Sequence, residues 1–164
     1  MQRKRFRLYL ETSVWMRLAA DSTDPRRKVT FRFLRALQRG HRILVSGLVR
    51  EEIRRVLHPS AKRSLLRRFR RYRCRPLPET RAVRRLALEL LREGGWSTDK
   101  GEDMTHHSFA MLKGVDALVT WDVRDLARPR TRMIAARCGR RHNLKLPLIG
   151  TPPEIARWLG LPTP

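Results

Sequence analysis

Apolar and polar positions along the chain follow two different spacings, and each predicts a different kind of element. Short apolar runs bounded by polar or turn residues are typical of buried strands, whereas apolar residues every three or four positions are typical of amphipathic helices. The runs predict strands over residues 6–10, 42–46, 117–121 and 146–149. The helical spacing predicts helices over residues 14–20, 26–38, 47–57, 60–72, 79–93, 103–114 and 130–140, with a short last helix from about 151.

This order of elements predicts one fold class. Strands that alternate with helices are typical of a parallel sheet that is covered by helices on both faces. The 164 residues suit one compact domain, and the sequence shows neither a linker nor an internal repeat. We therefore predict a single α/β domain over residues 1–164, with a central parallel sheet of about four to five strands.

Charge adds a prediction about partners. The chain has 38 Lys and Arg against 15 Asp and Glu, a formal net charge of +23, and only six of the cations are lysines. Because guanidinium groups present a planar fork of donors that fits phosphate, this bias favours a nucleic-acid partner. Residues 54–78 and 126–153 contain no acid and would form two basic ridges. A solvated helix face, or arginine usage that follows genomic base composition or a hot habitat, is the alternative.

Several classes of protein are disfavoured. Cys74 and Cys138 lack a CxxC partner or histidines at metal spacing, so no zinc site is predicted. The basic start is followed by only three apolar residues before Glu11, far short of the apolar region of a secretion signal. No run approaches the ~20 apolar residues of a membrane span. A cytoplasmic protein without a membrane segment is the expectation.

Four acidic residues stand where parallel α/β sheets gather their ligands. Two follow predicted strands directly, one lies in the first turns of the helix after the second strand, and one opens the helix before the third strand. Carboxyl ends of parallel strands share one edge of the sheet, and carboxylates brought together there repel unless a cation neutralises them. Oxygen ligands suit hard cations such as Mg²⁺ or Mn²⁺. The predicted metal-binding and catalytic residues are Glu11, Glu52, Asp103 and Asp122. The alternative for each acid is a helix cap or a solvated element end.

Other candidate groups are assigned outside this set. Glu51 should point about 100° away from its neighbour on a helix, and an exposed role is favoured for Asp125. Asp116 precedes its strand and is expected at the opposite end of the sheet. His106 and His107 are adjacent and cannot face the same way on a helix, so His106 is interpreted as a packing or supporting group rather than a catalytic base.

The residues around these acids resemble the motifs of PIN domains. Residues 9–14 (Tyr-Leu-Glu-Thr-Ser-Val) are similar to the opening strand motif, and residues 46–53 (Ser-Gly-Leu-Val-Arg-Glu-Glu-Ile) to the second motif. Residues 103–122 look like the third and fourth motifs in one run, and residues 148–154 like the closing strand and helix. The resemblance spans about residues 5–159. It departs from the family pattern at Glu11, where most members have Asp.

The resemblance implies a Rossmann-like PIN fold and an Mg²⁺- or Mn²⁺-dependent endoribonuclease, closest to VapC-like toxins of toxin–antitoxin modules. It implies an RNA substrate, an acidic antitoxin as partner and a homodimer formed through the early helices. Thr12, Ser13 and Thr120 would orient carboxylates or water, or serve as ordinary capping hydroxyls. The arginines predicted to contact RNA are Arg67, Arg68, Arg70, Arg71, Arg130 and Arg132.

Two other functions remain open at this stage. One is a catalytically inactive RNA-binding module that keeps the PIN architecture, for which the glutamate at position 11 is the argument. The other is a metal-independent structural RNA-binding protein, for which the net charge of +23 is the main feature.

Overall fold

A computed structural model describes residues 4–74 and 76–162. In this part of the chain four strands form one sheet in the order β2-β1-β3-β4, and every pairing is parallel. The strands are β1 (Arg7–Leu10), β2 (Arg42–Leu44), β3 (Ala117–Val119) and β4 (Leu148–Gly150). The predicted α/β fold with a parallel sheet of four to five strands is therefore confirmed.

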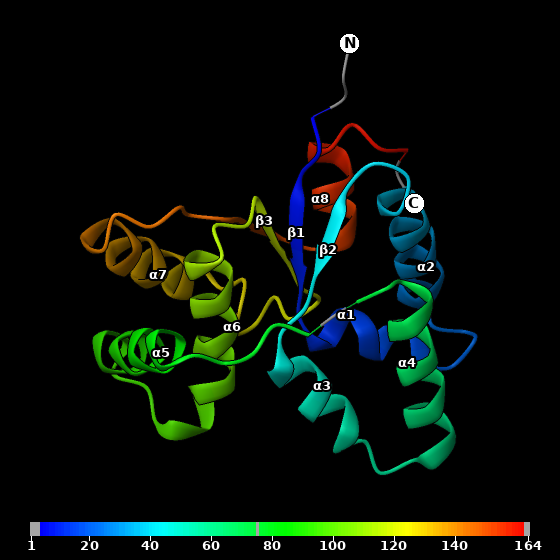
Figure 1. Ribbon diagram of the computed structural model, residues 1–164, viewed down its shortest axis with the longest axis horizontal. Coiled ribbons are helices and arrows are strands. Elements are labelled where there is room, and N and C mark those ends of the chain that lie inside the picture. Colours follow the sequence, from blue (N-terminus) through cyan, green and yellow to red (C-terminus); the bar gives the residue numbers. More distant parts are fainter. Residues whose placement is uncertain (1–3, 75, 163–164) are drawn as a thin grey trace.

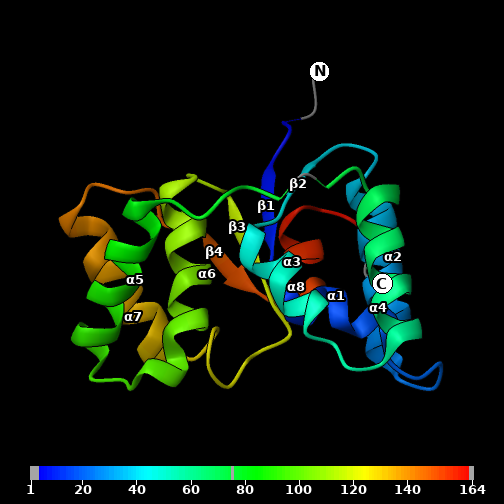
Figure 2. The same cartoon turned by 60° about the horizontal axis from the view of Figure 1, so that its bottom comes forward.

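Helices cover both faces of this sheet, as Figures 1 and 2 show. The chain follows β1 with α1 (Thr12–Met16), η1 (Arg17–Ala19) and α2 (Pro25–Leu37), and β2 with α3 (Gly47–Arg54), α4 (Pro59–Arg71), α5 (Arg81–Gly94), η2 (Thr98–Lys100) and α6 (Gly101–Leu112). After β3 and β4 come α7 (Pro129–Arg141) and α8 (Pro152–Trp158). Helices α5, α6 and α7 lie on one side, and α2 and α8 on the other.

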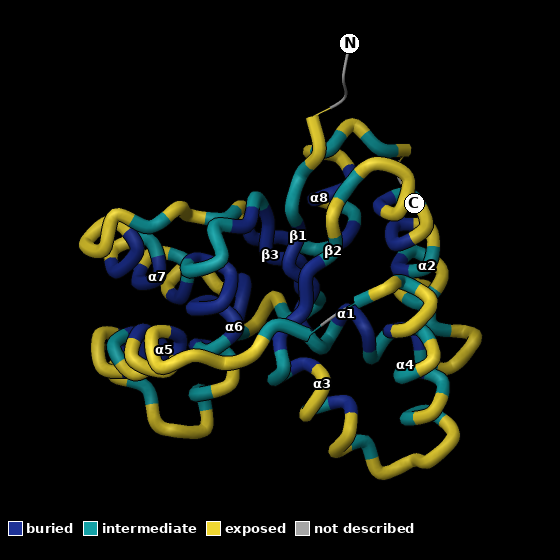
Figure 3. The backbone as a smooth tube through the Cα atoms, viewed as in Figure 1, coloured by how far each residue is buried: buried dark blue, intermediate teal, exposed yellow. Residues whose placement is uncertain are grey.

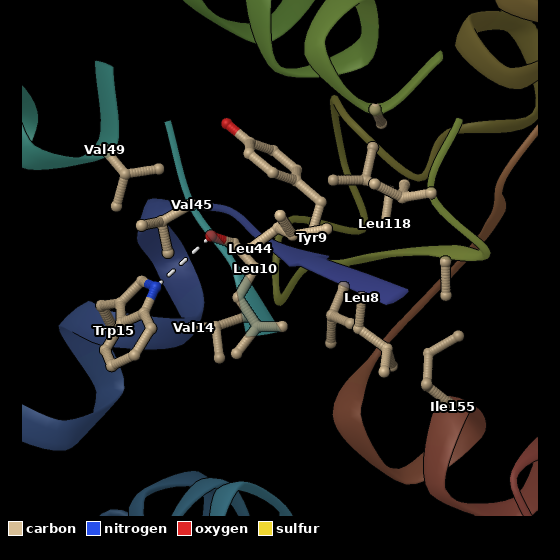
Figure 4. Packing of buried hydrophobic residues seen from close by; sticks show 14 of the residues in the cluster. Leu8, Tyr9, Leu10, Val14, Trp15, Leu44, Val45, Val49, Leu118 and Ile155 are labelled. Carbon is tan, nitrogen blue, oxygen red and sulfur yellow. Dashed lines mark hydrogen bonds between the residues drawn. The ribbon is translucent and has the colours of Figure 1, made fainter. Parts of the chain in front are cut away.

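The main core lies between the sheet and these helices. Successive residues of β1 point to opposite faces: in Figure 4 Tyr9 points away from Leu8 and Leu10, and all three side chains are buried. Figure 4 also shows the Trp15 indole donating to the carbonyl of Leu10, at 3.3 Å. A second apolar cluster joins α5, α6 and α7. Figure 3 shows that the buried residues gather along the strands and the inward sides of the helices.

The order of the strands indicates at which edge of the sheet a ligand binds. The chain moves outward from β1 to β2 on one side, and to β3 and then β4 on the other. In open α/β sheets ligands bind where the strand order reverses, at the carboxyl ends of the two central strands, here β1 and β3. In Figure 1 this is the lower edge of the sheet, where α1 and α3 begin and where the start of α6 also lies.

Two local differences from the sequence prediction concern this edge. The first helix begins at Thr12, and its cap is Glu11 instead of Thr12 or Ser13, because the Glu11 carboxylate accepts the Ser13 N–H at 2.8 Å. Residues 98–102, which lie between the helices predicted over 79–93 and 103–114, form η2 and the start of α6. This early start places Glu102 and Asp103 in the first helical turn, where the helix dipole favours acids.

The described helices include none that combines the length and apolar character of a membrane-spanning helix.

Candidate metal centre

Three aspartates form the acidic cluster at this edge. One carboxylate oxygen from each of Asp103, Asp122 and Asp125 lies within 4.8 Å of the others. Asp103 comes from the first turn of α6, whereas Asp122 and Asp125 follow β3. The Asp122 carboxylate accepts the backbone N–H groups of Arg124 at 3.1 Å and Asp125 at 3.0 Å. This Asx turn brings Asp125 to the same side as Asp122.

Asp125 is the residue that sequence reasoning assigned elsewhere. Its side chain is 38% exposed, so it is partly open to solvent, yet it belongs to the acidic cluster. The sequence did contain a signal for Asp125. Two aspartates three residues apart, directly after a strand, fit a turn that brings the second carboxylate back beside the first. The structure thus brings together two of the predicted acids, Asp103 and Asp122, with an acid that the prediction left out.

A lysine lies against the cluster. The Lys100 ammonium is 2.8 Å from a carboxylate oxygen of Asp125 and 3.8 Å from one of Asp103. The hydrogen bond to Asp125, together with the charges of Asp125 and Asp103, raises the pKa of Lys100, although burial acts in the opposite direction. Two acids are therefore balanced by a cation that belongs to the protein.

The arrangement of the carboxylates changes the pKa of Asp103. Burial, followed by the charge of Asp122, raises the pKa of Asp103 from 3.8 to about 6, although Lys100 and His106 act in the opposite direction. Carboxylates that repel one another are stabilised by a divalent cation, and an all-oxygen set fits the preference of Mg²⁺ or Mn²⁺. The chemistry of these donors therefore fits a hard metal ion.

Glu11 lies at the end of β1 and is buried, with 3% of its surface exposed. One carboxylate oxygen accepts the Ser13 N–H, and the other accepts the Ser13 hydroxyl. Burial raises the pKa of Glu11, and the nearby positive charge of His106 and the hydrogen bonds from Ser13 and Thr120 offset this only in part. Glu11 is thus a helix cap and a buried charge at this edge of the sheet.

Glu52 belongs to a buried hydrogen-bond chain. Its carboxylate accepts the Thr12 hydroxyl and lies 3.2 Å from Nε2 of His106. Nδ1 of His106 is 2.8 Å from the Tyr9 hydroxyl, which donates to Ser46 Oγ at 2.7 Å. Nε2 of His106 faces a carboxylate that only accepts, so this nitrogen carries a proton and donates to Glu52.

The pKa shifts agree with this assignment. Burial by itself lowers the pKa of His106, but its hydrogen bond to Glu52 and the charges of Glu52, Glu11 and Asp103 raise the net value. Burial raises the pKa of Glu52, yet the hydrogen bond and charge of His106 lower it overall. His106 thus interacts with three of the four predicted acids, and Asp103 connects them to Asp122.

Small hydroxyl side chains hold the backbone of the two central strands in register at the site. Ser13 Oγ accepts the Trp121 N–H at 2.7 Å and lies 3.4 Å from Thr120 Oγ1. Thr120 Oγ1 accepts the Asp122 N–H at 2.8 Å. These contacts fix the residues after β1 relative to the residues after β3, and thereby the position of Asp122.

The remaining candidates lie away from the cluster. Glu51 is exposed and pairs with Arg54. Asp116 accepts the Arg7 N–H at 2.7 Å at the opposite end of the sheet, as predicted. His107, unlike His106, is hydrogen-bonded to the carbonyl of Leu126.

The predicted RNA-contacting arginines fall into two groups. Arg67, Arg68, Arg70 and Arg71 lie on α4, and of these Arg68 is half-buried and the others are exposed. Arg130 and Arg132 lie in the first turn of α7. Arg130 donates to the carbonyl of Gly94 at the end of α5, and Arg132 to that of Ala127 just before α7, so both side chains hold backbone of the protein.

Comparisons with known proteins agree with the fold. A family model described as PIN domain matches residues 8–130. Among solved structures, a chain in the crystal structure of VapBC2 from Rickettsia felis, bound to a DNA fragment from their promoter, is similar with a TM-score of 0.58. The identity is 15%, over 88% of this chain and 98% of that chain, which is a likeness of fold. The search of curated proteins gave no match.

Proposed function

Since the chain belongs to the PIN-domain family, we propose that it is a divalent-metal-dependent endoribonuclease. The observation that carries the proposal is the convergence of Asp103, Asp122 and Asp125 at the carboxyl edge of the two central strands. Three carboxylates at such short separation repel one another, and a divalent cation relieves that repulsion. The buried acids Glu11 and Glu52 stand beside the cluster through their shared neighbour His106.

In this proposal Asp103, Asp122 and Asp125 hold Mg²⁺ or Mn²⁺. Glu11 and Glu52, the other two acids that the sequence predicts, would act from the β1 and α3 sides, on the ion or on its water. The bound ion would supply positive charge that favours deprotonation of the attacking water and stabilises charge on the phosphate during in-line attack.

The protein groups have separate tasks around that chemistry. Thr120 and Ser13 fix the backbone that carries Asp122. The His106 ring holds the Glu52 carboxylate in place through Nε2 and lowers its pKa. Lys100 balances part of the acidic charge and is close enough to the cluster to contact a phosphate oxygen of a substrate that reaches it. The net charge of +23 favours a polyanionic substrate such as RNA.

A role as the toxin of a toxin–antitoxin pair is part of the same proposal. The support is the resemblance to VapC-like toxins and the fold shared with a chain of the VapBC2 structure. An antitoxin with an acidic segment would complement the positive charge of this chain, and a homodimer is the expected assembly.

The test is cleavage of a structured RNA by the purified protein, with Mn²⁺ and with EDTA. We expect cleavage that EDTA abolishes and that the double substitution Asp103→Asn and Asp122→Asn removes while the circular dichroism spectrum is unchanged. Glu51→Gln is the matched control, because Glu51 is exposed and its carboxylate pairs with Arg54. Undiminished cleavage by the double variant contradicts the proposal. Tight RNA binding without cleavage by the wild-type protein would favour an inactive RNA-binding module.

A further inference from the structure

A cleft separate from the carboxylates opens between η1, α2 and α4. It has a volume of about 560 Å³ and is lined by the apolar residues Leu18, Ala19 and Ala61 and by polar side chains. The polar members are Arg27, His58, Ser60, Ser64 and Arg68, and we call this site the arginine cleft. In Figure 1 α2 and α4 both begin at their lower ends, α2 at about the height of α1 and α4 below it.

One aromatic ring fixes the two arginines of the cleft. The guanidinium carbon of Arg68 lies 4.5 Å from the centre of the Phe31 ring, and that of Arg27 lies 5.7 Å from it. Stacking on an aromatic face restricts a guanidinium group while leaving its outer N–H donors free. Phe31 therefore contacts both guanidinium groups of the cleft.

No carboxylate of the described residues lies within salt-bridge distance of the two guanidinium groups, although the charge of Arg27 helps to lower the pKa of the exposed Asp21. Within residues 4–74 and 76–162, neither Arg27 nor Arg68 forms an ion pair, and the Nε atom of each is buried without a hydrogen-bond partner. Burial and the charges of Arg27, Arg71 and Arg67 lower the pKa of Arg68. Elsewhere in the chain, by contrast, Arg141 pairs with Glu89 and Glu93. Two like charges held together without a counter-ion favour the binding of an anion.

The other groups of the cleft indicate which anion. Ser64 offers a hydroxyl donor from α4, and the Ser60 hydroxyl is hydrogen-bonded to Nδ1 of His58 at 2.9 Å. Guanidinium forks and a hydroxyl donor match the several oxygens of a phosphate group. The apolar wall of Leu18 and Ala19 can take the sugar or base next to that phosphate.

We propose that the arginine cleft binds a phosphodiester group of the RNA substrate, away from the bond that is cut. This inference rests on the proposed function for the identity of the polyanion. In this proposal one RNA strand would run from the cleft to the carboxylates at the ends of the central strands. The cleft then positions the strand, and Arg27 and Arg68 are positioning residues.

The test measures binding without cleavage. A fluorescent single-stranded RNA of twelve nucleotides is titrated with protein in EDTA, and the dissociation constant is followed by anisotropy at several salt concentrations. The double substitution Arg27→Gln and Arg68→Gln should weaken binding by about tenfold or more, and should make the slope of log K against log salt less steep by about 1. Orthophosphate should displace the RNA at lower concentration than acetate does at equal ionic strength.

The matched control is Arg32→Gln with Arg63→Gln, which removes the same charge from exposed positions of the same two helices. It should weaken binding only about twofold to threefold. Arg27→Lys with Arg68→Lys keeps both charges and serves as the fold control, and it should bind RNA with intermediate affinity, because an ammonium group cannot make a fork.

Three results would overturn the inference. The first is an equal loss in the cleft and control variants, which would mean general attraction without a site. The second is a lysine variant that binds as tightly as the wild type. The third is displacement of the RNA by a polyglutamate peptide at lower concentration than by orthophosphate, which would assign the cleft to an acidic protein. This assay measures RNA binding without cleavage. A wild-type protein that binds RNA at the cleft but does not cleave it would contradict the proposed nuclease activity and leave the cleft as an RNA-binding site.

Discussion

The ammonium of Lys100 lies 2.8 Å from the carboxylate of Asp125, on the edge of a cluster that also contains Asp103 and Asp122. The protein therefore brings its own cation to the place where a metal is proposed to bind. Lys100 and a divalent ion neutralise the same carboxylates, so the lysine lowers the affinity of these carboxylates for the ion. This relationship makes metal affinity the most direct property to measure.

Removing the lysine should strengthen metal binding. In Lys100→Met the Asp125 and Asp103 carboxylates lose their nearest cation, and we expect the dissociation constant for Mn²⁺ to fall by about threefold to tenfold, as measured by isothermal titration calorimetry. Lys113→Met, at the other end of α6, is the control and should leave the constant unchanged. Weaker Mn²⁺ binding in Lys100→Met would show that the ammonium organises the carboxylates instead of competing for them.

Removing the charge of Asp125 should have the opposite effect. If Asp125 is a metal ligand, Asp125→Asn weakens Mn²⁺ binding by about tenfold or more, because a neutral amide replaces a charged oxygen ligand. Asp99→Asn is the comparison, since Asp99 lies close by in sequence but is exposed and accepts a hydrogen bond from Ser97. Equal affinity of the Asp125 variant and the wild type would remove Asp125 from the ligand set.

The stability of the metal-free protein should depend on Asp103. The folded protein keeps the Asp103 proton up to about pH 6, whereas an ordinary aspartate releases it near 3.8. The folded state therefore binds more protons between these values, and the contribution of Asp103 to stability falls as the pH rises through this window. In EDTA, Asp103→Asn should be more stable than wild type at pH 8 by about 1–2 kcal/mol, after allowance for partial exposure.

Urea unfolding at pH 8 and at pH 4 checks this expectation. Near pH 4 much of the penalty is absent from the wild-type protein, so the two proteins should differ little. With saturating Mn²⁺ at pH 8 the order should reverse, because only the wild type binds the ion at full strength. A variant that is less stable than wild type at pH 8 in EDTA would contradict the raised pKa of Asp103.

The buried chain from Glu52 to Ser46 should depend on Tyr9. Tyr9→Phe keeps the ring in the core but deprives His106 and Ser46 of a hydrogen-bond partner in a site closed to water. We expect a loss of about 1–3 kcal/mol in the free energy of unfolding. Tyr72→Phe is the control, at a partly buried tyrosine, and should cost less than about 0.5 kcal/mol. An unchanged stability of Tyr9→Phe would mean that water or another group replaces the hydroxyl.

The sequence alone was sufficient to predict the strands and the class of fold. The apolar runs gave all four strands, and their alternation with helices predicted the parallel sheet. Because parallel strands present their carboxyl ends at one edge, the positions of Glu11 and Asp122 after β1 and β3 already predicted neighbouring carboxylates. The opposite position of Asp116 followed from the same rule.

The tertiary structure determined which carboxylates and which basic side chains lie close together. The turn after β3 brings Asp125 to the cluster through two backbone hydrogen bonds to Asp122, and the early start of α6 places Lys100 beside it. The arginine cleft likewise joins residues from α2 and α4, which only the packing of these helices brings together. Periodicity along a chain determines which side of an element is buried, but it contains no distance between side chains on different elements. Those distances are set by how the helices pack on the sheet, and the charges of a site respond to them over a few ångströms.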